Sequence, residues 1–409
     1  METWKRNLYV LWGVQFLAMM GMNLVVPFLP FFIRQLGVTD ENSLARWSGL
    51  VFSGPFLTAF IATPFWGKMG DKYGRKLMVV RAIFGLGAAQ ILTGFSQDVY
   101  QLFFFRMCQG AISGFLAASL ALVSTSTPKE RIGYALGLLQ SATAGGSVLG
   151  PAVGGFLADL IGYREIFFLV AAVCFLGGGV VMKLVREAPR QPQDDQEASV
   201  VDNARYMFTN KQLRIIGFTM ILAQASALMI EPIFALFVEQ FKTTTTYVST
   251  ITGITFAIAG IFMLVSAPWW GKRNDRLGFK KNLIAALSGT GIAYALHMLV
   301  PNLIVLGVLR AGLGFMRGGI LHALYSLTSL HAPSNRKSGL MGIASSLNIL
   351  GNMIGPMVGG SIAGHFGITS VFAFNSVLLL LTSLMVWRYL VEHRSPQSIE
   401  ATEVIELPE

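Results

Sequence analysis

The stretch TPFWGKMGDKYGRK, residues 63–76, recurs 204 residues later as APWWGKRNDRLGFK, residues 267–280. The same offset carries Arg106 to Arg310. A third stretch, GSVLGPAVGG (146–155), returns as GNMIGPMVGG (351–360), now 205 residues further on. Because three separate matches share nearly one offset, the sequence indicates two copies of one structural design.

The amino-acid composition indicates whether this repeated structure lies in water or in a lipid bilayer. The 409 residues are 53% hydrophobic and 13% charged, whereas a soluble domain carries about 25% charged residues. Apolar runs of about 20 residues, the length that a helix needs to cross a bilayer, alternate with short basic segments. We therefore predict an all-α membrane protein with 12 transmembrane helices in two six-helix pseudo-repeats, at residues 8–31, 46–67, 77–97, 99–125, 133–158, 165–185, 213–239, 248–270, 281–300, 303–327, 338–363 and 370–391.

The distribution of Lys and Arg predicts the orientation. With both termini in the cytoplasm, 24 of the 31 basic residues lie in cytoplasmic segments and at the cytoplasmic ends of helices, four lie on the other side and three lie inside spans. This bias is the positive-inside pattern, and it explains the net charge of +10 without a nucleic-acid partner. The predicted organisation is an N-terminal bundle (1–185), a cytoplasmic linker (186–212), a C-terminal bundle (213–391) and a cytoplasmic tail (392–409).

Four motifs resemble those of the major facilitator superfamily, and within it the twelve-helix drug:proton antiporters such as the bacterial multidrug exporters. They are GKMGDKYGRK (67–76) in loop 2–3, LFFFRMCQGAISG (102–114) in helix 4, GSVLGPAVGG (146–155) in helix 5 and GMNLVVPFLP (21–30) in helix 1. The resemblance covers residues 5–392. It implies alternating access, a small-molecule substrate, protons and the lipid bilayer as partners, a monomer, and a multi-pass location in a bacterial inner membrane. It implies no cofactor, because the proton gradient supplies the energy.

The loop 2–3 motif is predicted to form a cytoplasmic gate from Gly67, Asp71, Gly74 and Arg75. The two glycines permit a tight turn. Asp71, an acidic residue among basic ones, can accept hydrogen bonds from the free N–H groups of a helix N-terminus. The resemblance places that N-terminus at the start of helix 11, near Ser338. A basic loop that only sets the topology is the alternative.

The helix-5 motif predicts close packing of that helix against its neighbours. Small residues on one face let helix backbones approach, and a proline bends the helix; the residues are Gly146, Gly150, Pro151, Gly154 and Gly155. The antiport role of this motif comes from the resemblance alone. Pro27, near the outer end of helix 1, is predicted to bend that helix.

Ionisable residues within predicted spans are functional candidates because burying them in a bilayer is costly. Glu231 is the only carboxylate well inside a predicted span, and a carboxylate in a low-dielectric cavity can exchange a proton near neutral pH. The resemblance assigns proton coupling to Arg106 as well. The alternatives are a structural ion pair for Glu231 and loop-carbonyl contacts for Arg106.

The remaining polar residues within the spans are candidates for a substrate cavity or for bonds between helices: Asn23, Gln140, Gln224, Arg310, Arg317, His322, Asn348 and Asn352. Helix 10 contributes two arginines and a histidine, so two hypotheses remain. One is proton-coupled export of small amphipathic compounds or drugs, and the other is a dedicated transporter of an organic anion such as a carboxylate siderophore. We expect neither an enzyme nor a metal site, because the sequence contains no Walker loop, GxSxG or HExxH motif.

Overall fold

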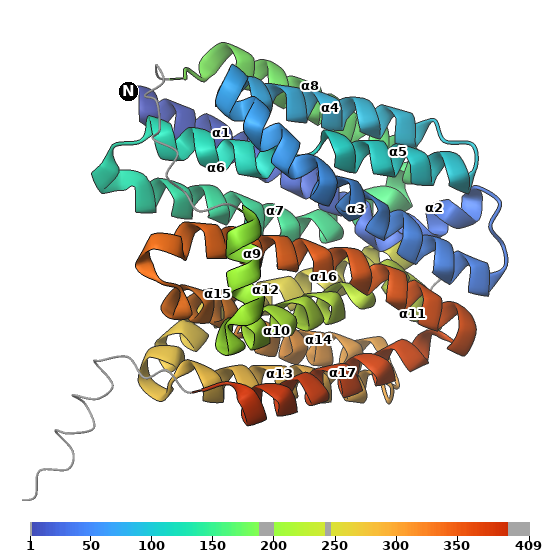
Figure 1. Cartoon of the computed structure of the whole chain (residues 1–409). Helices are drawn as coiled ribbons and strands as arrows, with labels where there is room; N and C mark the ends of the chain where they lie inside the picture. Colours follow the sequence, from blue (N-terminus) through green and yellow to red (C-terminus); the bar gives the residue numbers. More distant parts are fainter. Residues whose placement is uncertain (1, 188–199, 242–246, 392–409) are drawn as a thin grey trace, which may run out of the picture. The chain divides into compact units, whose positions relative to one another are not determined.

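The computed structural model describes residues 2–187, 200–241 and 247–391, and these ranges contain helices but no strand (Figure 1). The first predicted half contains α1 (Thr3–Leu24), η1 (Val26–Phe28), α2 (Leu29–Gln35), α3 (Glu41–Tyr73), α4 (Arg75–Gly94), α5 (Val99–Ile112), α6 (Phe115–Ser126), η2 (Lys129–Arg131), α7 (Ile132–Ile161) and α8 (Tyr163–Leu184). The predicted linker contains α9 (Val200–Thr209). The second half contains α10 (Lys211–Met229), η3 (Glu231–Ile233), α11 (Phe234–Glu239), α12 (Val248–Leu277), α13 (Phe279–His297), α14 (Leu303–Arg317), α15 (Ile320–His331), η4 (Ser334–Arg336), α16 (Lys337–Phe366) and α17 (Ile368–Tyr389).

The all-α membrane fold is confirmed. Ten helical segments of the described chain are long and apolar enough to cross a membrane. The other two predicted spans, 281–300 and 338–363, also fall on long helices, α13 and α16. The count of twelve spans and the cytoplasmic position of both termini stay predictions.

Helices 1 and 7 are interrupted at equivalent places. A 3₁₀ turn with proline at its centre separates α1 from α2, and another separates α10 from α11; the prolines are Pro27 and Pro232, 205 residues apart. Proline lacks the N–H that the α-helical ladder needs, so the ladder is replaced here by a tighter turn. Helix 1 is thus interrupted at Pro27, where the sequence predicts a bend, and helix 7 is interrupted in the same way by the turn that begins at Glu231. A functional bend at Pro27 stays a prediction.

Helices 4 and 10 are also interrupted at equivalent places, which the apolar runs did not reveal. Helix 4 breaks between α5 and α6 at Ser113 and Gly114, where Gly114 has φ +115°. Helix 10 breaks between α14 and α15 at Gly318 and Gly319. Glycine is the residue that tolerates both positive φ and close backbone approach, so it occurs at both breaks.

Contacts group the described residues into two units, each with its own core. Unit 1 comprises the described residues of Met1–Gln193, Glu231–Ala257 and Pro356–Gly367. In it α1 packs along α7 and α8, α3 along α5, and α4 along α8 (Figure 1). Unit 2 comprises the rest, and in it α13 packs against α14 and α17, and α10 against α15 and α17. Unit 1 thus includes segments of both predicted halves, and the predicted halves themselves stay a prediction.

Two local expectations differ from the structure. The predicted linker 186–212 contains a helix, α9, whose Met207 and Asn203 are buried, while residues 188–199 of the linker and the tail 392–409 lie outside the described residues. The expectation that Gly67 forms a turn is wrong, because α3 continues through it to Tyr73. The turn is made by Gly74 alone, at φ +112°.

Candidate substrate cavity and coupling residues

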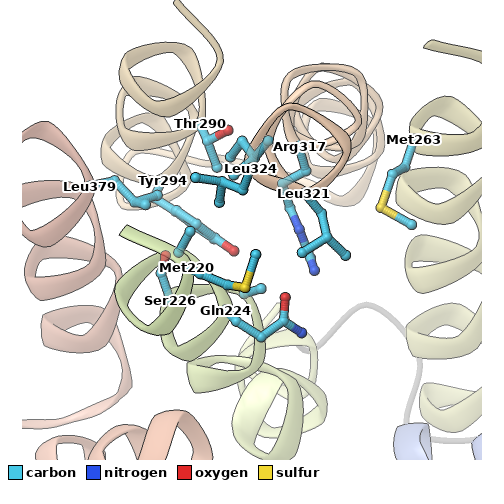
Figure 2. A pocket seen from close by; sticks show the side chains of 13 residues that line it. Met220, Gln224, Ser226, Met263, Thr290, Tyr294, Arg317, Leu321, Leu324 and Leu379 are labelled. Carbon is cyan, nitrogen blue, oxygen red and sulfur yellow. The ribbon is translucent and has the colours of Figure 1, made fainter. Parts of the chain in front are cut away.

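Unit 2 contains a cavity of about 160 Å³ that brings together two of the predicted cavity residues, Gln224 and Arg317 (Figure 2). Its wall comes from six helices of unit 2. The lining residues are Met220, Ala223, Gln224, Ser226 and Ala227 of α10, Met263 of α12, Thr290 and Tyr294 of α13, Arg317, Ile320, Leu321 and Leu324 of α14–α15, and Leu379 of α17. Figure 2 shows the Arg317 guanidinium and the Gln224 amide directed into the same space.

The break in helix 10 places Arg317 at this cavity. Arg317 is the last residue of α14, and the two glycines after it let α12 approach closely. A Cβ atom on Gly319 would lie 2.6 Å from Cδ2 of Trp270, and one on Gly318 would overlap the Ser266 hydroxyl. The Trp270 indole N–H donates to the Phe315 carbonyl over 2.7 Å, which satisfies a carbonyl near the end of α14.

The Arg317 guanidinium has no hydrogen bond or ion pair with any residue that the structure describes, and no acidic residue is among those lining the cavity. The Gln224 amide donates to Asn352 Oδ1 over 2.6 Å, so Asn352 supports the cavity wall. The Ser226 side chain is 1% exposed, and its hydroxyl has no hydrogen-bond partner within the described ranges.

The other predicted cavity residues lie elsewhere. Arg310 is buried in α14 and does not line this cavity, while His322 and Gln140 are exposed and Asn348 is half-buried. Asn23 belongs to unit 1, where its amide donates to the Met19 carbonyl over 2.8 Å and lies 3.5 Å from the Ser147 hydroxyl. None of these five roles in substrate binding is tested, and all five stay predictions.

Helix 5 packs as closely as its glycines predict. Cβ atoms on Gly146, Gly150 and Gly154, which follow one another at intervals of four residues, would overlap or crowd α1. A Cβ on Gly155 would overlap the Ser249 carbonyl of α12, and Pro151 lies inside an unbroken α7. The role of these residues in antiport stays a prediction.

The two predicted coupling residues both lie in unit 1. Arg106 on α5 is 6% exposed, and its Nη1 donates to Gln109 Oε1 over 3.0 Å. Glu231 is half-buried in η3, which contacts both η1 and α3. Glu231 therefore lies where the interrupted helices 1 and 7 meet.

Further contacts within unit 1 join the predicted outer ends of helices from both halves. Asp159 near the end of α7 accepts two hydrogen bonds from Thr250 at the start of α12, from its N–H over 2.8 Å and from its hydroxyl over 2.7 Å. Arg34 forms a two-pronged ion pair with Glu239, at 2.8 and 2.9 Å, beside a second cavity of about 490 Å³. A carboxylate at a helix N-terminus and a forked arginine–carboxylate pair are both strong polar contacts.

The cytoplasmic motif is organised differently from the prediction. Glu187, and not Asp71, occupies a helix N-terminus in unit 1: it accepts from the N–H groups of Arg75 and Lys76, over 2.8 and 3.1 Å, at the start of α4. The Arg75 side chain donates to the Ala121 carbonyl over 2.8 Å. The Asp71 side chain is 74% exposed and lies 3.9 Å from Arg75. Its contact with helix 11 would join the two units and stays a prediction.

Arg81 is the main residue that sequence reasoning missed. It lies inside α4, its guanidinium carbon lies 3.3 Å from the Trp66 ring centre, and its Nη2 donates to the Ser113 carbonyl over 3.1 Å. Arg81 lies near the cytoplasmic end of the predicted span 77–97, so its position did not distinguish it from the basic residues that set the topology. Asp159 was missed because its predicted span ended one residue earlier, although it follows Gly155 by four residues on the same helical face.

This fold and its residues define a membrane transporter of known type: a family model described as "Major Facilitator Superfamily" matches residues 11–263 and 216–406, and the chain belongs to that family. It is 35% identical to "Multidrug resistance protein MdtG" of Proteus mirabilis (strain HI4320), over 97% of this chain and 98% of the relative. It is 35% identical to the protein of the same name from Escherichia coli (strain K12 / DH10B), over 96% and 97%.

Among solved structures, the fold resembles that of a bacterial homologue of the human lysosomal transporter Spinster, in an inward-facing and occupied conformation. The TM-score is 0.79, with 13% identity, and the match covers 95% of this chain and 97% of that one. At this identity the likeness concerns the fold alone.

Proposed function

We propose that this chain is a secondary active transporter that exports small amphipathic compounds, including drugs, in exchange for protons. The observation that carries the proposal is the 35% identity, over nearly the whole length, to relatives named as multidrug resistance proteins. These names favour drug export over a dedicated carrier of one organic anion. The protein is not an enzyme, acts as a monomer in a bacterial inner membrane with both termini in the cytoplasm, and needs no cofactor besides the proton gradient.

Glu231 is the proton-binding residue of this proposal. It begins the 3₁₀ turn that interrupts helix 7, beside the equivalent turn of helix 1, so a change in its charge acts where two interrupted helices meet. Protonation shifts the inward–outward equilibrium only if the two states bind the proton with different affinity, and substrate binding resets it in the same way. Arg106 modulates that equilibrium from helix 4.

Opening toward the outside requires that the outer contacts of unit 1 separate. The Asp159–Thr250 hydrogen bonds and the Arg34–Glu239 pair join segments of the two predicted halves there. The helix-5 glycines bring α7 against α12 at the same end. Alternating access therefore involves breaking a few strong polar contacts together, and the free energy of substrate or proton binding has to offset their loss.

Proton movement in proteoliposomes with an imposed pH gradient tests this function. We expect wild-type protein to release protons when amphipathic drugs are added, and Glu231→Gln to abolish the coupling. Glu130→Gln makes the same chemical change at an exposed loop residue and serves as the matched control. Coupling that survives in Glu231→Gln contradicts the role of Glu231, and transport that is indifferent to the gradient contradicts proton exchange altogether.

A further inference from the structure

We infer that the cavity of unit 2 binds the acidic end of an amphipathic substrate, with Arg317 as the residue that recognises the charge. The inference rests on the proposed export function and specifies its substrate class: compounds with an apolar body and a carboxylate or similar anionic group. Four properties of the cavity carry it, namely its charge, its polar companions, its apolar wall and its size.

The charge of the cavity is positive and is not neutralised by the protein. Arg317 is the only charged residue among those lining it, and its guanidinium bonds to no described residue. Leaving a partly buried charge without a partner is costly, whereas a ligand carboxylate would offset that cost. The planar guanidinium presents five N–H donors in a fork that matches a carboxylate with two parallel hydrogen bonds. A cationic head group would be repelled at the same place.

Four neutral polar residues line the cavity beside Arg317, Gln224 and Ser226 of α10 and Thr290 and Tyr294 of α13, and the first two bear on ligand binding. Ser226 offers a buried hydroxyl whose hydrogen-bonding capacity is unused within the described residues, and buried polar groups are normally paired. The amide of Gln224 is held in place by Asn352 and has a second N–H that this bond does not use. Both residues belong to α10, and Figure 2 shows the Gln224 amide facing the Arg317 guanidinium.

The rest of the wall suits an apolar body of varied shape. Met220 and Met263 provide flexible, polarisable side chains, and Leu321 and Leu324 complete the apolar surface. The volume of about 160 Å³ is close to that of an engineered cavity of about 150 Å³ that binds benzene, and below the 300–1,000 Å³ of sites that enclose a whole drug. The cavity therefore accommodates one end of a larger compound.

At the equivalent place in the first half, an arginine beside a broken helix contacts other residues of the protein. There Arg81 stacks on Trp66 and its Nη2 donates to the Ser113 carbonyl, while its Nε and Nη1 have no hydrogen-bond partner among the described residues. Arg317 occupies the position equivalent to Ser113, 204 residues on, and has no such bonds. The contrast favours a ligand-binding role for Arg317 over a structural one.

Equilibrium binding to the full-length protein in lipid nanodiscs tests the inference by calorimetry, at neutral pH and with empty nanodiscs as background. The probes share one apolar body: 4-phenylbutyrate, 4-phenylbutyramide and 4-phenylbutyl-trimethylammonium. We expect wild type to prefer the carboxylate, and Arg317→Gln to weaken carboxylate binding by about 10- to 100-fold while leaving amide binding within about twofold. Arg317→Lys should be intermediate, because it keeps the charge and loses the fork.

Arg276→Gln, the same change at an exposed residue of α12, should behave as wild type. Equal affinity of wild type for all three probes, equal weakening of all three by Arg317→Gln, or no binding of any probe would overturn the inference. Binding needs no proton gradient, so a failure here is distinct from a failure of proton-coupled export, which Glu231→Gln tests separately.

Discussion

The breaks in helices 4 and 10 lie at equivalent places in the chain and use their arginines in different ways. In each, a tryptophan indole donates over 2.7 Å to a carbonyl near the end of the first segment: Trp66 to Ala111, and Trp270 to Phe315. At the first break Arg81 is stacked and hydrogen-bonded, whereas at the second Arg317 faces a cavity without a protein partner in the described chain. Duplication thus preserved the backbone interruption, while single residues decided whether it is sealed or open to a ligand.

Replacing each arginine by methionine should give the largest effect that tests this comparison, a change in the free energy of unfolding. We expect Arg81→Met to lower the free energy of unfolding by about 2–3 kcal/mol, because a charge-assisted hydrogen bond and a cation–π contact are lost. Arg317→Met should change it by less than about 0.5 kcal/mol, because no bond is lost. Unfolding in mixed detergent–SDS micelles, followed by circular dichroism, measures both. Equal losses at the two positions would contradict the comparison.

A smaller effect should come from adding one methyl group at each break, for different reasons. Gly114→Ala forces alanine to φ +115°, and Gly319→Ala places its Cβ 2.6 Å from the Trp270 ring; each should cost about 1–2 kcal/mol of unfolding free energy. Double mutants separate the causes. Trp270→Leu should remove most of the cost of Gly319→Ala, and Trp66→Leu should leave the cost of Gly114→Ala in place.

The smallest effect should come from the indole donors, and it should be the same in both halves. Trp66→Phe and Trp270→Phe each keep an aromatic ring and remove one hydrogen bond to a carbonyl, which is worth about 1 kcal/mol. The two losses, measured by the same unfolding assay, should agree within about 0.5 kcal/mol. A much larger loss at one break would show that the two tryptophans are not equivalent.

The sequence predicted more of the fold than of the site. Helical period, span length and the repeated motif are local properties of the chain, so the helices, the bend at Pro27 and the close packing of helix 5 could be predicted from it. The breaks in helices 4 and 10 could not, because apolar runs continue through Gly114 and Gly318. Glycine is required by the backbone conformation at Gly114, φ +115°, and by the approach of α12 at Gly318. The recurrence of Trp66 and Trp270 was visible, but the carbonyls to which they donate were not.

For the candidate site, the residue types could be predicted from the sequence, but their neighbours could not. Arg310, Arg317 and His322 looked alike as basic residues of one span, and the fold directs only Arg317 into a cavity with Gln224. The contact predicted for Asp71, at the start of helix 11, and the contact observed for Glu187, at the start of α4, use the same chemistry, and the sequence did not reveal the second.

By itself, the sequence determined that the chain is helical, lies in a membrane, is built from a repeat and belongs to a transporter family. These properties depend on hydrophobicity, charge bias and motif spacing, which are local properties of the amino-acid sequence. Only the tertiary structure decided which polar groups are satisfied by the protein and which remain for a ligand. That outcome depends on residues from several distant helices, as at Arg81 and Arg317, where one side chain type is bonded in one half and available in the other.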